Sequence, residues 1–371
     1  MTDPALLALV RRFTAERVGP RAAGDEEAGR FPRDLLDDLG RMDLLGLPFS
    51  EEDGGSGLGF GAYLSVVEEL SRAFLTVGMS LSVHTLATWA VATYASDEVR
   101  KEWVPAMTAG RSLGAYSLSE PGSGSDAAGL TTRAVLQGDH YVVDGTKAWV
   151  THAGHADFYV LMCRTSPDRT RGISALLVPA GTPGMSFPLA EKKMGMRSSP
   201  TGQIVFEGAL VPARNLLGVE GQGLQIALSA LDGGRLGIAA CSTGLAQAAL
   251  DHAVAYARDR RQFGRPIGDF QGVGFMLADM ATQIAAARAL WMEAAARRDA
   301  GEQFGTSAAM AKLFASDMAM RVTTDAVQIF GAYGYTTDYP VERLMREAKV
   351  LQIVEGTSQV QRMVISRALL A

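Results

Sequence analysis

Cysteine and histidine are scarce in this chain, and their scarcity excludes several kinds of site. The 371 residues include two cysteines, Cys163 and Cys241, and five histidines. Two distant cysteines provide neither a CxxC pair nor a disulfide framework, a composition that fits a reducing cytoplasm. His152 and His155 have HxxH spacing, but no acidic or cysteine ligands cluster beside them in the sequence. We therefore expect no metal site.

A strong charge of one sign is also lacking. The net charge is -5 and 20% of the residues are charged, which argues against a protein that binds nucleic acid by electrostatic attraction. The apolar run at residues 5–10 is too short for a signal peptide. We expect every longer apolar stretch to be interrupted by charge, as residues 224–250 are by Asp232 and Arg235. We therefore predict no transmembrane helix and no membrane partner.

What the sequence does contain is a change of pattern along its length. Residues 1–113 place apolar side chains at helical spacing. Residues 114–217 contain short apolar and β-branched runs separated by turn signals such as Asp144-Gly145, which are typical of a small antiparallel β domain. Residues 218–371 return to helical spacing in four long segments, the last at about 341–369. We predict an α+β fold with an N-terminal α-helical domain, a middle antiparallel, barrel-like β domain and a C-terminal four-helix bundle.

Glu355 stands at the junction of an apolar run, residues 351–354, and a glycine, Gly356. An apolar flank removes water from a carboxylate and raises its pKa towards neutrality, as a general base requires. The glycine lets the backbone turn tightly against a ligand. Glu355 is therefore a candidate base for removing a proton from carbon, and the alternative is a surface glutamate in a loop.

Three other segments suggest ligand contacts, and each has a plainer alternative. Residues 57–62 match the G-x-G-x-x-A part of a dinucleotide fingerprint, but a loop-like approach precedes them instead of the required strand. Residues 122–126 are small and polar, which suits a loop that approaches a polar ring or phosphate, or an ordinary turn. Arg260 ends a long helical segment, where its guanidinium would hold a pyrophosphate or simply be solvated.

Five motifs occur in a familiar order and spacing. They are Tyr116–Asp126, Lys147–Thr151, Arg260–Gly264, Gln328–Gly331 and Glu355–Arg362. Together they make the chain resemble the acyl-CoA dehydrogenase family over essentially its whole length. The resemblance implies a flavoenzyme with non-covalent FAD, a homotetramer built as a dimer of dimers. It also implies oxidation of the Cα–Cβ bond of an acyl-CoA thioester to a trans-2-enoyl-CoA, with electron-transfer flavoprotein as the acceptor.

The resemblance also implies a role for Glu355. By position, Glu355 takes the α-proton while the β-hydride moves to flavin N5, and its own N–H helps to stabilise the charge on the thioester carbonyl. Isovaleryl- and long-chain-type members carry the base where this chain has Gly234, which has no side chain to act. The base is therefore expected at Glu355, as in short-chain and medium-chain members.

The same position-by-position match assigns the contacts to cofactor and substrate. The flavin and its linker are expected to contact Tyr116, Leu118, Ser119, Gly124, Ser125, Trp149 and Thr151, and the adenosine half Thr357 and Gln359. Residues expected to reach the FAD of a neighbouring subunit are Arg260, Gln262, Phe263, Phe270, Gln271, Gln328 and Gly331. The acyl-CoA substrate is expected to contact Ser125, Asp232, Gly233, Gly234, Arg235 and Gly356.

Two alternatives to this reading remain open at this level. The substrate would be a short or medium, straight or branched acyl-CoA, but a family member in secondary metabolism would act on an acyl-carrier-protein thioester. A non-catalytic flavin-binding protein, resembling the DNA-associated member of the superfamily, is the other alternative. The acidic balance and the lack of a basic C-terminal patch argue against it. The expected location is the cytoplasm.

Overall fold

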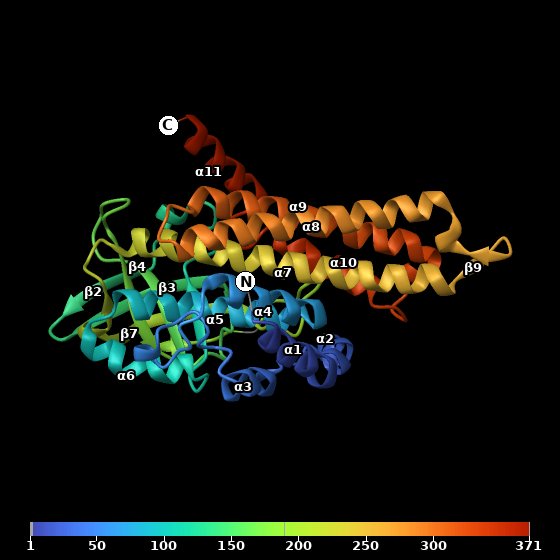
Figure 1. The fold of residues 1–371 in the computed structure, drawn as a ribbon. Helices are drawn as coiled ribbons and strands as arrows, with labels where there is room; N and C mark the ends of the chain where they lie inside the picture. Colours follow the sequence, from blue (N-terminus) through green and yellow to red (C-terminus); the bar gives the residue numbers. More distant parts are fainter. Residues whose placement is uncertain (1–2, 189, 371) are drawn as a thin grey trace.

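The computed structural model describes residues 3–188 and 190–370. Along the chain, a helical region is followed by a β-sheet and then by a second helical region (Figure 1). The predicted fold class is confirmed. The first helical region contains α1 (Pro4–Phe13), α2 (Ala22–Ala28), α3 (Arg33–Arg41), α4 (Phe60–Ala73), α5 (Leu75–Tyr94) and α6 (Asp97–Thr108). Its helices form where apolar side chains recur at helical spacing: in α3, Leu35, Leu36 and Leu39 are buried on one face.

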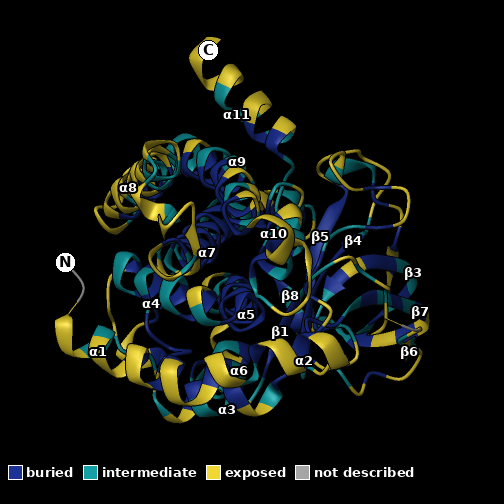
Figure 2. Ribbon diagram, turned by 90° about the vertical axis from the view of Figure 1, so that its right-hand side faces the viewer, coloured by how far each residue is buried: buried dark blue, intermediate teal, exposed yellow. Residues whose placement is uncertain are grey.

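Helix α5 corrects the expectation that charge interrupts every long apolar stretch. Its 20 residues contain no Asp, Glu, Lys or Arg, and by length and composition it could cross a membrane. However, 89% of its most apolar window is buried inside the fold, which is the behaviour of a core helix. Figure 2 shows α5 as a dark blue helix enclosed by its neighbours. We therefore take α5 as the core helix on which α4, the sheet and the C-terminal helices pack.

The middle region forms one sheet that is mixed. Its strands are β1 (Gly114–Ser117), β2 (Arg133–Gln137), β3 (His140–Thr151), β4 (Phe158–Arg164), β5 (Ile173–Pro179), β6 (Met185–Ser186), β7 (Thr201–Pro212) and β8 (Leu216–Leu217). The order is β6-β7-β3-β2-β4-β5-β8, and β1 pairs with β4 in parallel. The expectation of a purely antiparallel sheet is wrong in this detail. The long β2–β3 excursion supplies the crossover that a parallel pair needs.

The C-terminal region contains α7 (Gly223–Asp259), a small hairpin of β9 (Arg261–Gln262) and β10 (Arg265–Pro266), α8 (Gln271–Asp299), α9 (Gly305–Phe330), α10 (Val341–Leu351) and α11 (Ser358–Leu370). Helices α7, α8 and α9 run side by side, with the hairpin at one end (Figure 1). The predicted single helix at 341–369 is wrong, because Glu355 and Gly356 have left-handed backbones and separate α10 from α11. Helix α11 projects from the body (Figure 2).

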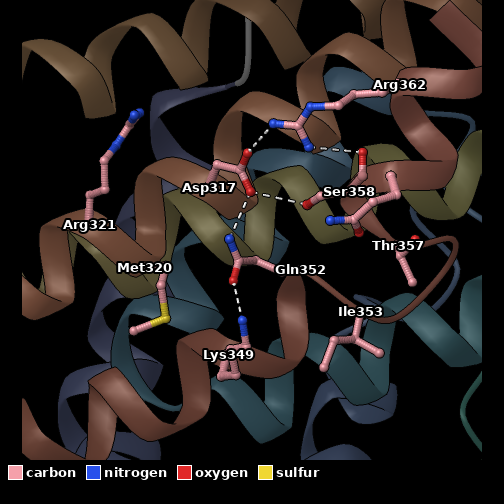
Figure 3. A pocket seen from close by; sticks show the side chains of 10 residues that line it. Asp317, Met320, Arg321, Lys349, Gln352, Ile353, Thr357, Ser358 and Arg362 are labelled. Carbon is pink, nitrogen blue, oxygen red and sulfur yellow. Dashed lines mark hydrogen bonds and ion pairs between the residues drawn. The ribbon is translucent and has the colours of Figure 1, made fainter.

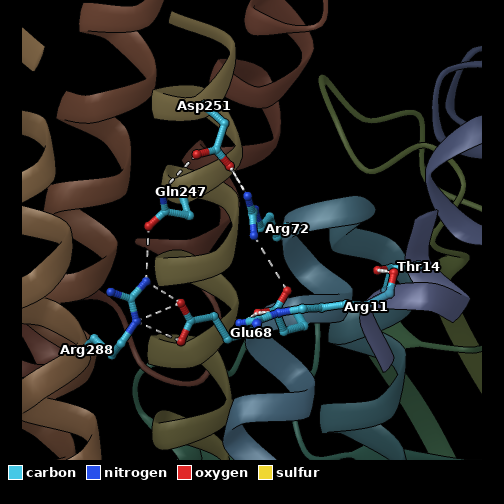
Figure 4. A network of polar contacts seen from close by, with 8 residues as sticks. Arg11, Thr14, Glu68, Arg72, Gln247, Asp251 and Arg288 are labelled. Atoms are coloured by element: carbon cyan, nitrogen blue, oxygen red, sulfur yellow. Dashed lines mark hydrogen bonds and ion pairs between the residues drawn. The ribbon is translucent and has the colours of Figure 1, made fainter. Parts of the chain in front are cut away.

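Buried apolar side chains and a chain of ion pairs join the first helical region to the bundle. One hydrophobic cluster contains residues of α1, α3, α4 and α5 together with residues of α7 to α10. At its edge, Arg288 of α8 donates to Glu68 of α4, and Arg72 of α4 pairs with Asp251 of α7 (Figure 4). Gln247 links Arg288 to Asp251. These contacts hold α4 against α7, which matters because both helices line a cavity described below.

Candidate active site

Glu355 lies on a turn between α10 and α11 that the surrounding helices hold in an uncommon conformation. The φ angles of Glu355 and Gly356 are +53° and +90°, so two consecutive residues are left-handed. Gln361 donates to both backbone carbonyl oxygens of the turn, at 3.2 Å and 2.8 Å. Lys312 Nζ donates to the Gly356 oxygen at 2.9 Å. Both Gln361 and Lys312 are fully buried, so the turn is fixed from inside the protein.

The Glu355 carboxylate is placed for general-base chemistry. Its Oε2 atom is buried and has no hydrogen-bond partner among the described residues, although the residue as a whole is partly exposed. Burial raises the pKa of Glu355 to about 7, and the positive charges of Lys312 and Arg235 oppose that rise. A carboxyl group of this pKa exists in both protonation states near neutral pH, as an efficient base requires.

Gly234 on α7 provides the space that the carboxylate occupies. A Cβ atom at Gly234 would lie 2.0 Å from Glu355 Oε2, closer than any real Cβ contact. The neighbouring Gly233 has ordinary space, since its nearest atom would be 3.8 Å away on Phe60. The family resemblance places the base at position 234 in some members and at position 355 in others. In this structure, side chains at these two positions would occupy the same small volume.

A cavity of about 230 Å³ opens beside Gly234. Its walls include Phe60 and Tyr63 of α4, Ser82 and Leu86 of α5, and the predicted substrate residues Asp232, Gly233 and Gly234. Arg235, the remaining charged residue predicted on α7, is buried and donates through Nη1 to Asp232. The structure thus places Glu355 against Gly234, a residue of the cavity wall, although Glu355 is not itself a lining residue. Ser125 is exposed on a loop and is not a lining residue either.

The two segments predicted to contact the flavin lie next to each other. The backbone N–H of Ala148 on β3 donates to the Ser119 oxygen at 2.9 Å, which places Trp149 beside the loop after β1. A β-bulge between Lys147 and Val150 gives Trp149 a φ of +61° and leaves 62% of it exposed. Thr151 closes the same strand, opposite Thr201.

A buried ion pair anchors this loop. Lys147 Nζ, fully buried, bonds to Glu120 at 2.8 Å and to the Leu118 oxygen at 2.9 Å. Glu120 also accepts from the backbone N–H groups of Thr131 and Thr132. These bonds and the Lys147 charge hold the pKa of Glu120 at about 2, against the burial that would raise it. The loop is therefore rigid before any ligand binds.

The residues present fit a flavin. The buried Tyr116 hydroxyl has no hydrogen-bond partner among the described residues, although buried polar atoms normally have one. The nearby Trp149 presents an exposed aromatic surface of the kind that covers a planar ring. Tyr116, Leu118, Ser119, Trp149 and Thr151 would hold the ring. Gly124 and Ser125 are exposed further along the same loop, where a linker would pass.

Thr357 and Gln359, predicted to contact the adenosine half, line a separate cavity of about 480 Å³. Figure 3 shows its centre, where Asp317 accepts hydrogen bonds from Gln352, Ser358 and Arg362. The basic side chains of Arg321 and Lys349 also line this cavity. A cavity with several cations suits an anionic, polar group such as a nucleotide.

The remaining predicted cofactor residues lie elsewhere in the chain. Arg260, Gln262, Phe263, Phe270, Gln271, Gln328 and Gly331 gather around the β9–β10 hairpin end of the bundle. Arg260 lies over the Tyr333 ring at 5.5 Å, and the rings of Phe263 and Phe270 are 5.9 Å apart. Phe263 is 93% exposed. Figure 1 places this hairpin at the opposite end of the long helices from the sheet. Within one chain, the hairpin residues and Glu355 therefore do not form a single site.

Four residues that hold the site together were given no role from the sequence, although three of them, Gln361, Lys147 and Glu120, lie within the five motifs. Lys312 and Gln361 hold the Glu355 turn, and Lys147 and Glu120 anchor the flavin loop. A lysine among alanines of α9 is the one available signal, since a charge on the apolar face of a helix needs a partner. His152, part of the HxxH pattern, is buried between Gly114 and Ser80 and contributes to packing. Among the described residues, no group of three His, Cys, Asp or Glu side chains is placed to hold a metal ion.

Comparison with known proteins gives a consistent result over the whole chain. Residues 2–111, 115–209 and 221–370 match the families described as the N-terminal, middle and C-terminal domains of acyl-CoA dehydrogenase. The short-chain specific acyl-CoA dehydrogenase of Clostridium acetobutylicum is 45% identical over 360 residues, covering 96% of this chain and 95% of that protein.

Two solved structures share the fold in detail. Butyryl-CoA dehydrogenase from Megasphaera elsdenii has a TM-score of 0.98 and 40% identity, covering 100% of this chain and 99% of its own. A chain from the structure described as "Electron transferring flavoprotein of Acidaminococcus fermentans: Towards a mechanism of flavin-based electron bifurcation" has a TM-score of 0.97 and 44% identity. It covers 99% of this chain and 97% of its own.

Proposed function

Because the chain belongs to the acyl-CoA dehydrogenase family, we propose that Glu355 is the base with which it dehydrogenates a short acyl-CoA. The enzyme is an FAD-dependent oxidoreductase that acts on the CH–CH group of an acyl-CoA thioester. An acyl-carrier-protein substrate is not favoured, because the relatives at 40–45% identity are acyl-CoA and butyryl-CoA dehydrogenases. The observation that carries the base assignment is the buried Glu355 carboxylate against Gly234.

The proposed chemistry divides between the chain and its cofactor. FAD, when bound, accepts the β-hydride of the substrate. Glu355 removes the α-proton, and its N–H, which lies outside the regular helices α10 and α11, is available to bind the thioester carbonyl. Asp232, which accepts a hydrogen bond from Arg235, and Arg298 are charged residues of the cavity wall, where the pantetheine chain would lie. The burial of Glu355 Oε2 keeps water from that oxygen.

We propose a short acyl group as the substrate. The cavity volume of about 230 Å³ is below the range of roughly 300–1,000 Å³ that is typical of sites for larger ligands. The Phe60 and Tyr63 rings on α4 and Leu86 on α5 limit its depth. The test is anaerobic titration of the purified yellow protein with butyryl-CoA and palmitoyl-CoA. Bleaching of the flavin band by butyryl-CoA alone would support the assignment, and bleaching by palmitoyl-CoA would contradict it.

We propose a homotetramer in which the hairpin end of one subunit completes the FAD site of another. This proposal is supported by the exposure of Phe263 and of Tyr335, which is 88% exposed. Co-expression of the Arg260→Ala and Glu355→Gln chains tests it. Random pairing should restore about a quarter of the wild-type activity, because each mixed pair contains one complete site. No restoration above either single variant would rule out a shared site, and sedimentation would give the subunit number.

Electron-transfer flavoprotein is the proposed electron acceptor, and the cytoplasm is the proposed location. A solved structure whose description names an electron transferring flavoprotein has this fold at 44% identity, which supports the first. Cys163 and Cys241 are both free and buried, which is compatible with a reducing compartment. Turnover that depends on added electron-transfer flavoprotein would support the acceptor. Rapid peroxide formation in air without it would point to an oxidase.

A further inference from the structure

Lys312 is a buried lysine in α9 that the proposed reaction does not use. It is 0% exposed, and its Nζ donates to the Gly356 oxygen at 2.9 Å. Within the described ranges, Lys312 forms no ion pair. An ammonium group has three donors, and burying it without a carboxylate partner costs considerable free energy. Such a residue needs a reason to be there, and its one hydrogen bond ends on the residue after the base.

The Glu355–Gly356 turn is a conformation that needs support. A non-glycine residue with positive φ costs on the order of 1 kcal/mol or more and persists where its surroundings hold it. Two buried side chains meet at the Gly356 oxygen: Lys312 at 2.9 Å from α9 and Gln361 at 2.8 Å from α11. One of these donors is charged and the other is neutral. Their roles can therefore be separated by experiment.

Lys312 differs from the other charged residues near Glu355 in its ion pairing. Arg235 on α7 also faces the carboxylate, but Arg235 is paired with Asp232. Asp317, five residues after Lys312 on α9, is paired with Arg362 of α11.

The other titratable groups that face Glu355 are Tyr63 on α4, Tyr116 on β1 and Cys241 on α7. Burial raises the pKa of both tyrosines and raises the pKa of Cys241 to about 12, so all three are neutral near pH 7. Lys312 is thus the cation beside Glu355 that lacks a carboxylate partner among the described residues.

We propose that Lys312 is a positioning residue for the base: it holds the turn through the Gly356 carbonyl, and its charge favours the ionised form of Glu355. Burial lowers the pKa of Lys312 to about 8, so the ammonium form prevails at neutral pH. The inference rests on the proposed role of Glu355. It adds that the basicity of Glu355 is set from α9, 43 residues earlier in the chain, and by the charge of Lys312 as well as by its hydrogen bond.

The test compares Lys312→Met with Gln361→Met in the FAD-loaded enzyme. Each variant removes one of the two donors to the Gly356 oxygen, but only the first removes a charge. In Lys312→Met, the low-pH limb of kcat/KM should move to higher pH by about one unit, because the carboxylate loses a nearby cation. In Gln361→Met, kcat/KM should fall while the pH of its low-pH limb stays unchanged. An unmoved limb in Lys312→Met, or an equal shift in both variants, would overturn the proposal.

A second measurement reads the base directly. An acyl-CoA with sulfur in place of its β-carbon cannot lose a hydride, so enzyme-dependent exchange of its α-protons with deuterated water reports proton removal. The exchange should show the same pH shift in Lys312→Met. If Lys312→Met does not fold, Lys312→Gln keeps a neutral donor and should still shift the limb. Undiminished exchange in Glu355→Gln would refute the base itself, whereas lost exchange there with no shift in the lysine variants would refute this inference alone.

Discussion

Two regions of the chain carry predicted cofactor and substrate residues, and they are built in opposite ways. Around Glu355, buried side chains from α7, α9 and α11 converge on one turn, which is complete within a single chain. Around the β9–β10 hairpin, Arg260 is partly exposed over the Tyr333 ring and Phe263 is almost fully exposed. The first region needs internal support because its chemistry depends on a desolvated carboxylate. The second has surfaces that await a partner.

The difference shows that the five motifs contain residues of two kinds, those expected to act in catalysis and those expected to retain FAD. Substitution of a residue near Glu355 should lower the turnover of its own subunit and leave the FAD content unchanged. Substitution of a residue near the hairpin should lower the FAD content and leave the residues around Glu355 in place. Measuring turnover and FAD content together therefore tests whether the division is real.

The largest effect is expected for Glu355→Gln. Loss of a general base lowers turnover by about 10²- to 10⁴-fold, while the FAD absorbance per subunit should stay at the wild-type level. Turnover with butyryl-CoA and the flavin spectrum give the two readouts. Substantial remaining dehydrogenation would show that another residue is the base. The region around Glu355 would then not be the catalytic one of the two.

A smaller loss is expected for Gly234→Ala. The added Cβ would lie 2.0 Å from Glu355 Oε2, and a displacement of the base by about 1 Å lowers the rate by roughly 10²-fold. Gly233→Ala is the matched control, because its Cβ meets nothing closer than 3.8 Å. Although Gly233 also lines the cavity, that control should lose less activity than Gly234→Ala and should gain about 0.5–1 kcal/mol of helix stability. Equal activities of the two variants would show that Gly234 does not make room for the base.

At the hairpin end, Arg260→Ala should weaken FAD binding by about 10- to 100-fold, the worth of hydrogen bonds to a charged group. The exposed Arg258, two residues earlier on α7, provides a control with the same change of charge. Dialysis followed by measurement of bound flavin would show the difference, and the subunit fold should be unaffected in both. If Arg258→Ala loses as much flavin, the effect is one of overall charge, and the hairpin has no specific role.

The smallest effect concerns stability and pH. Burial raises the pKa of Glu355 from 4.5 to about 7, so its contribution to stability is fully present below pH 4.5 and is lost as pH rises through 7. Glu355→Gln should therefore match the wild type near pH 4.5 and exceed it by about 1–2 kcal/mol at pH 8, allowing for partial exposure. Unfolding at both pH values measures this. Glu16→Gln at an exposed position is the control for the substitution itself.

The fold class was predictable from the sequence, and Glu355 was identified there as a candidate base, for different reasons. The alternation of helical and β patterns reflects local burial, which periodicity records directly. Glu355 stood out because an apolar run and a glycine flank it. Lys312 did not stand out, because its partner is a backbone oxygen on another helix, and no local pattern marks such a contact.

Two errors have physical causes of the same kind. The break between α10 and α11 was missed because Glu355, a good helix former, adopts a left-handed backbone that tertiary contacts maintain. The expectation that charge interrupts every long apolar stretch failed at α5 because 89% of its most apolar window is buried by tertiary packing, where charged side chains are rare. The roles of the individual cofactor residues remain predictions.

The space beside Gly234 has a consequence for how such a protein can change over generations. A side chain at 234 and the carboxylate end of residue 355 compete for the same volume, because a Cβ at 234 would lie 2.0 Å from Glu355 Oε2. A change at either position therefore alters where the other side chain can lie, and carboxylates at both would place two like charges side by side, which raises the pKa of one of them. Positions 234 and 355 are therefore best interpreted together when sequences are compared.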